Sequence, residues 1–381
     1  MLAMAILFPG VALGYEFRLV PSLAAQEGYN SNIYFTPQDR VNSWVTRVAP
    51  ALDVSGKTER LDAAIGGSLI WWWYSADANL NAMDYDARGR VAYRFSDTFR
   101  ASATGEYRKE SSPTRNFEAT GVVQSFYRDY RQDYTAEAEY ALSEKATTTL
   151  SYEYEKVDYP DRPFQNFTAH NADLGFAYNL SRFATETKAR GGLGYGRGEY
   201  EGLTVDNYYL TVGVFRAVHE LWSVQVDVGG RYTASQFDVL GVRQESKDRG
   251  WVGHASVQYT GERTNASFTF SSNVAPAYGY VGAVQRTAGV LNLSRRFLHE
   301  LSGTLSAGYY RNKSQAGQYS YRTIDEQSAQ LGPGLRWEAT KHIVFDAVYQ
   351  FYWLRNELTG ENSVQNSVFA RATLSYPFFD E

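Results

Sequence analysis

The chain has 381 residues, of which 44% are hydrophobic and 15% aromatic, and its formal net charge is −5. It has no cysteine, which excludes a disulfide framework and a thiolate metal centre. The small negative charge offers no basic surface for nucleic acid, so no nucleic-acid partner is expected.

The first 14 residues, MLAMAILFPGVALG, form a short apolar run that ends in the small residues of Ala12-Leu13-Gly14. This pattern predicts a signal peptide over residues 1–14, too short to cross a bilayer as a helix. The basic residues that usually open such a peptide are missing, so a truncated start is expected. A buried first strand is the alternative, and Pro9 and Gly10 disfavour it.

After residue 14, segments with two-faced alternation recur along the chain. In the stretch TFRASATGEYR (98–108), apolar and small residues such as Phe99 and Ala101 alternate with Arg100 and other polar residues. Similar alternation is found in QDYTAEAEYAL (132–142), LWSVQVDVGGRYT (221–233) and IVFDAVYQFYW (343–353). Segments of roughly 10 to 14 residues have the length of tilted strands that cross a bilayer. Residues 15–381 are therefore predicted to form one all-β domain, a transmembrane antiparallel up-and-down β-barrel.

The connections between these segments alternate between two kinds. Tight turns are predicted at 96–97, 143–145, 181–183, 219–220, 261–263 and 339–341, and longer polar loops at 109–118, 158–166, 311–322 and 355–362. Outer-membrane barrels have short periplasmic turns and longer extracellular loops. The count gives about 18 strands. Sixteen is the alternative, because the strands within 109–130 and 197–216 are the least regular.

The alternation also assigns side chains to the two faces of the barrel wall. Aromatic residues on the lipid-facing side are expected to form an interfacial girdle: Trp71, Trp73, Tyr107, Trp222, Tyr349, Phe351 and Tyr376. The predicted lumen-lining charged residues are Arg88, Arg90, Arg94, Arg100, Glu106, Arg108, Arg131, Asp133, Glu137, Glu139, Glu153, Asp173, Lys188, Arg190, Asp227, Arg231, Arg286, Arg336, Asp346 and Arg371, with Asp84, Asp86 and Glu186. They serve either as cross-strand ladders that stiffen the wall or as a surface that selects cargo. Trp72 points inward, where it either packs at the rim or stacks on a carbohydrate.

No segment has the features of a plug, and the loops are short for an infolded constriction loop. A barrel of 16 to 18 strands then leaves a wide aqueous lumen, open or closed by a partner. No enzyme is expected: His170 and His254 are predicted to be lumenal, and no nucleophile motif surrounds them. The oxygen-rich stretch Asp77–Asn81 departs from a calcium loop at its sixth and twelfth positions. No catalytic, metal or cofactor site is predicted.

A family resemblance is found near the N-terminus. The stretch YNSNIYFTPQDRVNSWVTRVAPALDVSG (29–56) resembles the opening hairpin of the β-barrel porin 2 family, with matching pieces at 29–34 and 45–52. The resemblance implies an outer-membrane barrel of a Gram-negative bacterium, embedded in lipid and lipopolysaccharide. Several members of that family are associated with exopolysaccharide or capsule export. It therefore implies a porin-like channel involved in such export, with periplasmic polysaccharide-export proteins as partners.

The last predicted strand, within VFARATLSYPFFDE (368–381), ends in aromatic residues. In such barrels this ending is recognised by the outer-membrane assembly machinery, which is a further expected partner. Two alternative functions remain at this point: a general diffusion porin, and a structural sheath around an electron-transfer protein. The sheath would need a separate haem protein, because this chain has no cysteine to bind haem covalently.

Overall fold

The computed structural model describes residues 16–111, 128–162, 165–182, 184–239 and 241–378. Within these residues, eighteen strands form a single antiparallel sheet, and residues 1–14, predicted to be a signal peptide, lie outside them. The strands are β1 (Glu16–Asn30), β2 (Ser43–Lys57), β3 (Leu61–Tyr74), β4 (Ala82–Arg94), β5 (Phe99–Glu110), β6 (Asp129–Ala141), β7 (Ala146–Asp158), β8 (Phe167–Asn179), β9 (Thr187–Tyr200), β10 (Leu203–His219), β11 (Trp222–Val239), β12 (Val242–Thr260), β13 (Thr264–Pro276), β14 (Ala283–Arg296), β15 (Leu301–Ser314), β16 (Ile324–Glu338), β17 (Ile343–Asn356) and β18 (Asn362–Ser375). A 3-10 turn, η1 (Ala78–Leu80), lies between β3 and β4.

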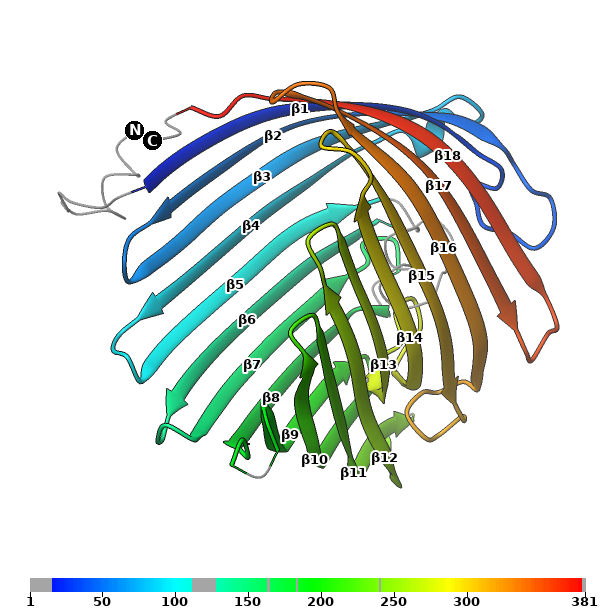
Figure 1. Cartoon of the computed structure of the whole chain (residues 1–381). Helices are drawn as coiled ribbons and strands as arrows, with labels where there is room; N and C mark the ends of the chain where they lie inside the picture. The colour runs from blue at the N-terminus through cyan, green and yellow to red at the C-terminus, as the bar shows by residue number, and fades with distance from the viewer. Residues whose placement is uncertain (1–15, 112–127, 163–164, 183, 240, 379–381) are drawn as a thin grey trace, which may run out of the picture.

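The sheet closes on itself to form a barrel (Figure 1). Each strand pairs with its neighbours in the chain, and β1 also pairs with β18 through nine residue pairs, from Ser22–Ser375 to Asn30–Ser367. Among the described strands, closure gives every strand a hydrogen-bonded neighbour on both sides, which is what an apolar membrane interior requires. The predicted antiparallel barrel and its count of 18 strands are confirmed, and the alternative of 16 is wrong.

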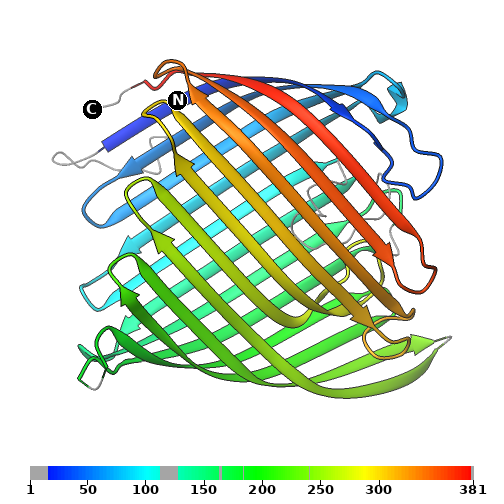
Figure 2. The same cartoon turned by 45° about the vertical axis from the view of Figure 1, so that its right-hand side comes forward.

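The two ends of the barrel carry different connections, and Figure 2 shows both ends. We call the end at which β1 begins and β18 ends the turn rim. Its connections follow even-numbered strands and are residues 58–60, 95–98, 142–145, 180–186, 220–221, 261–263, 297–300 and 339–342. We call the other end the loop rim; its connections are 31–42, 75–81, 111–128, 159–166, 201–202, 240–241, 277–282, 315–323 and 357–361. The segments predicted as tight turns all lie at the turn rim, and those predicted as longer loops all lie at the loop rim.

The two segments with the least regular predicted strands, 197–216 and 109–130, differ from each other in the structure. The irregular segment 197–216 consists of two strands, β9 and β10, joined only by Glu201 and Gly202. Gly202 has a φ of +67°, which a tight hairpin turn favours and glycine adopts at little cost. The segment 109–130 is different, because only residues 109–110 and 129–130 lie in strands and 112–127 lie outside the described residues.

The outward side of the sheet is apolar. Leu150, Leu174, Leu193 and Leu210 face one another in register across β7, β8, β9 and β10. Each is between 47% and 57% exposed. A row of half-exposed leucines is unfavourable in water and is typical of a surface that contacts lipid. An antiparallel barrel closed behind such a surface has the architecture of a Gram-negative outer-membrane protein.

The described residues contain no helix that is both long enough and apolar enough to span a membrane.

Candidate functional site: the lumenal wall and the infolded connections

The structure places the sequence-assigned side chains on two faces of the sheet. Outward positions, which share the parity of the exposed leucines, hold Trp71, Trp73, Tyr107, Trp222, Tyr349, Phe351 and Tyr376. The opposite, inward parity holds Asp84, Asp86, Arg88, Arg90, Arg94, Arg100, Glu106, Arg108, Arg131, Asp133, Glu137, Glu139, Glu153, Asp173, Lys188, Arg190, Asp227, Arg231, Arg286, Arg336, Asp346 and Arg371.

Two sequence assignments differ from the structure. Glu186 lies in the connection 180–186 and not in a strand. His170 lies opposite Tyr154 on the outward parity, and its ring nitrogen is 2.7 Å from the Tyr152 hydroxyl. The prediction that His170 is lumenal is therefore wrong, whereas His254, opposite Asp227, is on the inward parity. Among the described side chains, no group of three His, Asp or Glu residues could hold a metal ion.

Many inward charges form ion pairs between strands. Arg100 on β5 lies 2.6 Å from Glu139 on β6. On β18, Arg371 lies 2.8 Å from Asp346 of β17, and Arg336 of β16 approaches the same carboxylate at 3.9 Å. These pairs place opposite charges close together along the lumenal face, so neither sign dominates it locally.

Some of these interactions span three strands, with a glycine on the middle strand. Arg190 on β9 and Asp227 on β11 are 3.1 Å apart, and both are register partners of Gly213 on β10. A Cβ atom at Gly213 would overlap the Asp227 carboxylate. Glycine is therefore required where the side chains of the two outer strands meet.

The same arrangement recurs at two other places in the wall. Arg88 on β4 lies 2.7 Å from Asp53 on β2, and both pair with Gly66 on β3. The Tyr209 hydroxyl on β10 donates a hydrogen bond to Asp173 on β8 across Gly194 on β9. Here too a Cβ atom on the glycine would overlap the neighbouring side chains.

On the loop rim, the connection 277–282 between β13 and β14 folds into the barrel (Figure 1). Its Tyr278 donates a hydrogen bond to Glu155 of β7, and the guanidinium of Arg131 on β6 lies 4.5 Å from the Tyr278 ring centre. Arg286 on β14 approaches the same ring at 5.8 Å. Burial, and next the charge of Glu155, raise the pKa of the Tyr278 phenol well above its ordinary value, so it stays a neutral donor.

The connection 315–323 between β15 and β16 packs beside it. Tyr319 accepts a hydrogen bond at 2.7 Å from Arg231 of β11 and donates one to Asp248 of β12. The two connections are joined because the Ser320 hydroxyl donates a hydrogen bond to the Val281 carbonyl oxygen at 2.8 Å. Beside it, Ala283 at the start of β14 donates its N–H to the Tyr319 carbonyl oxygen at 2.8 Å. Tyr319 belongs to a buried apolar cluster that also contains Phe167 of β8, and Tyr278 packs against this cluster.

The expectation of a wide lumen without infolded loops is therefore wrong on this side of the barrel. The connection 277–282 has only six residues, yet its Tyr278 reaches strands β6 to β8. Along the sheet, five strands separate β13 from β7. Sequence reasoning missed these residues because it judged the loops by length alone. The composition of the two connections could have indicated that they are buried. AYGYVG (277–282) and QAGQYSYRT (315–323) are rich in tyrosine for connections exposed to water.

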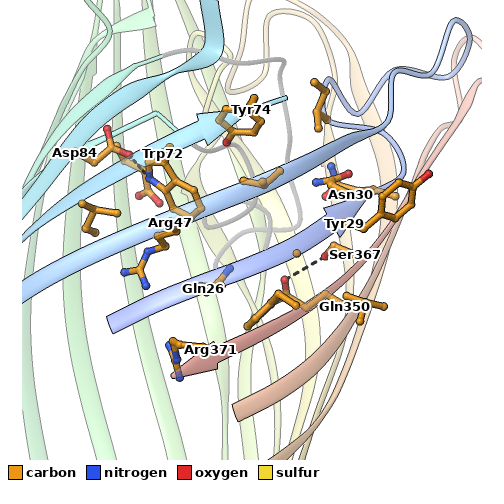
Figure 3. A pocket seen from close by; sticks show the side chains of 18 of the residues that line it. Gln26, Tyr29, Asn30, Arg47, Trp72, Tyr74, Asp84, Gln350, Ser367 and Arg371 are labelled. Atoms are coloured by element: carbon orange, nitrogen blue, oxygen red, sulfur yellow. Dashed lines mark hydrogen bonds between the residues drawn. The ribbon is translucent and has the colours of Figure 1, made fainter. Parts of the chain in front are cut away.

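A pocket of about 420 Å³ lies elsewhere on the inward face, towards the loop rim (Figure 3). It lies against β1 to β5 and β17 to β18, and Gln26, Arg47, Trp72, Gln350 and Arg371 are among its lining residues. Trp72 is the inward tryptophan of the sequence WWW (71–73) and donates its indole N–H to Asp84 at 3.0 Å. The pocket combines an aromatic ring with amide and charged groups.

Comparison with known proteins gives only distant structural likenesses. No family model matches the chain, and no curated protein matches it either. Solved structures with a similar course of the chain include OccAB4 of Acinetobacter baumannii, at 10% identity and a TM-score of 0.48, with 95% of this chain and 98% of that one covered. OpdL of Pseudomonas aeruginosa has 11% identity and a TM-score of 0.43, covering 96% and 98%. The copper transporter OprC has 10% identity and a TM-score of 0.49, covering 92% and 62%.

At such identities and scores, no residue role or cargo passes from those proteins to this chain. The fold of the chain rests on its own strand pairing, which closes β1 against β18.

Proposed function

We propose that this protein is an outer-membrane channel of the porin type that lets hydrophilic solutes cross the bilayer. The observation that carries the proposal is the closed 18-stranded barrel with an apolar outer face and a charged inner face. A barrel of this size encloses an aqueous space unless that space is filled. Paired charges along the inner face offer water and polar solutes a hydrated path through the bilayer.

The infolded connections favour small solutes as the cargo. Residues 277–282 and 315–323 occupy space on one side of the loop rim and are fixed there by Tyr278 and Tyr319. A polymer chain or an enclosed protein would need that space. Exopolysaccharide export, which the family resemblance implies, is a narrower second proposal. The same steric argument weighs against it and against the sheath function, so passage of small solutes is the function that the geometry supports best.

The test is conductance of the purified barrel in planar bilayers. We expect open channels with little preference between K⁺ and Cl⁻, because inward pairs such as Arg371 with Asp346 leave neither sign dominant. Liposome swelling with uncharged solutes of increasing size gives the size limit. A barrel that conducts nothing in either assay would overturn the proposal.

The export function has its own test. Deletion of the gene should trap or abolish an extracellular polysaccharide while its synthesis continues. Normal polysaccharide display in the deletion strain would refute export and leave the small-solute channel in place.

A further inference from the structure

We propose that the pocket beside Trp72 is a binding site for uncharged sugars. This inference rests on the proposed function, because the sugar would be a solute of the channel. The pocket volume of about 420 Å³ lies within the range of small-molecule sites, roughly 300–1,000 Å³. Its lining comes from both ends of the chain, since β1 lies between β18 and β2 in the closed sheet.

The indole of Trp72 is held in a fixed orientation. Its N–H donates to Asp84 at 3.0 Å, and Asp84 in turn accepts from the hydroxyl of Ser111 at 2.7 Å and from the Ser111 backbone N–H at 3.1 Å. Asp84 is only 3% exposed. An aromatic ring fixed in this way is preorganised, and a ligand that stacks on it does not have to immobilise it.

The two sides of the Trp72 ring differ in their neighbours. On β2, Arg47 is its register partner and places its guanidinium 5.5 Å from the ring centre. On β4, the register partner is Ala82, whose side chain is a single methyl group. The indole lines the pocket and is partly exposed. An apolar ring face beside polar groups suits a sugar, which has one face of C–H groups and a rim of hydroxyls.

Amide side chains provide groups that can bind hydroxyls. Gln26 on β1 is the register partner of both Arg47 and Arg371, and its amide makes no side-chain hydrogen bond within the described residues. Across the pocket, Gln350 on β17 accepts a hydrogen bond from Ser367 at 3.5 Å (Figure 3). An amide both donates and accepts, as a sugar hydroxyl does.

The charges in this region favour an uncharged ligand. Arg371 makes two hydrogen bonds to the Asp346 carboxylate, at 3.0 and 2.8 Å. Arg108 lies 2.9 Å from Glu106, and Asp86 accepts a hydrogen bond from Ser68. An anionic or cationic ligand would have to compete with these partners, whereas a neutral polyol only adds hydrogen bonds.

The experiment measures ionic current through single barrels while uncharged sugars are added. The probes are maltotriose, cellotriose and trehalose, with glucuronate as the charged comparison. We expect at least one uncharged sugar to interrupt the current in a saturable way, and glucuronate to do so at least tenfold more weakly. Trp72→Ala should weaken the interruption at least tenfold, and Gln26→Ala should weaken it severalfold.

The matched control is Trp73→Ala, one residue along β3 on the outward face and 44% exposed, which should leave the interruption unchanged. Trp72→Phe keeps a ring and should retain part of the effect, which separates loss of stacking from misfolding. If none of the sugars interrupts the wild-type current, or if Trp72→Ala is interrupted as strongly as wild type, the sugar site is refuted. Failure of the channel proposal is distinguishable, because then no current flows before any sugar is added.

Discussion

Tyr278 and Glu155 are 123 positions apart in the chain, yet the tyrosine hydroxyl donates a hydrogen bond to the carboxylate. The strand that carries Glu155 is separated from β13 by the five strands β8 to β12. This contact ties the connection 277–282 to the wall on the far side of those strands. It is a hydrogen bond to a charged group in a largely buried place, and such bonds are the stronger ones.

We expect Tyr278→Phe to loosen this connection without unfolding the barrel. Loss of a hydrogen bond to a charged group costs about 1.5–3 kcal/mol, and Glu155 would be left buried beside Arg131. Single-channel recordings should show more frequent current fluctuations, and a protease site introduced at Gly279 should be cut faster.

The control for that variant is Tyr309→Phe. Tyr309 also donates a hydrogen bond, at 2.7 Å to Gln327, but it lies on the outward face of β15. Identical recordings from Tyr278→Phe and wild type would show that the connection is not held by this contact.

Gly213→Ala should destabilise the barrel. The new methyl group would overlap the Asp227 carboxylate and the backbone of β11, and overpacking of this kind costs about 1–3 kcal/mol. The measurement is the urea midpoint of unfolding in detergent micelles. Gly191→Ala is the matched control, because a Cβ atom there meets no atom within 4 Å. Equal midpoints for the two variants would contradict the requirement for glycine at position 213.

The two faces of the wall should respond differently to a new charge. Phe345→Arg places a cation on the outward face, at a cost of about 2–4 kcal/mol if the position is near the bilayer midplane. Ser306→Arg, on the exposed inward face of β15, should be tolerated because it points to water. The heat-modifiable mobility of the folded barrel on gels reports the folded fraction. A worse yield from Ser306→Arg would mean that the faces are assigned in reverse.

The orientation of the barrel in the membrane is tested with inserted protease sites. We predict that the turn rim is periplasmic and the loop rim extracellular. A site inserted at Gly360, an exposed glycine with no neighbour within 4 Å of its added Cβ, should be cut on intact cells. A site between Ser143 and Glu144, on the turn rim, should be cut only after the outer membrane is opened. The opposite result would show that the turn rim is extracellular and the loop rim periplasmic.

The alternation of apolar and polar residues was sufficient to predict the barrel architecture. The alternation around Arg100 assigns each side chain to a face, because successive residues of any strand point to opposite sides. The positions of the turns follow from the same pattern, and with them the number of strands. Trp72 could be placed inward and Trp73 outward by parity alone, before any partner was known.

The contacts that shape the lumen depend on partners distant in the chain. Nothing near Tyr278 in the sequence indicates Glu155, and nothing near Gly213 indicates that Arg190 and Asp227 meet across it. Gln26 comes to lie between Arg47 and Arg371 only because β1 pairs with both β2 and β18. Periodicity is a property of neighbouring residues, so the sequence determined the strands, their faces and the closed sheet. Register and loop packing arise from the closure of eighteen strands. The infolded connections and the pocket could therefore be recognised only in the three-dimensional fold.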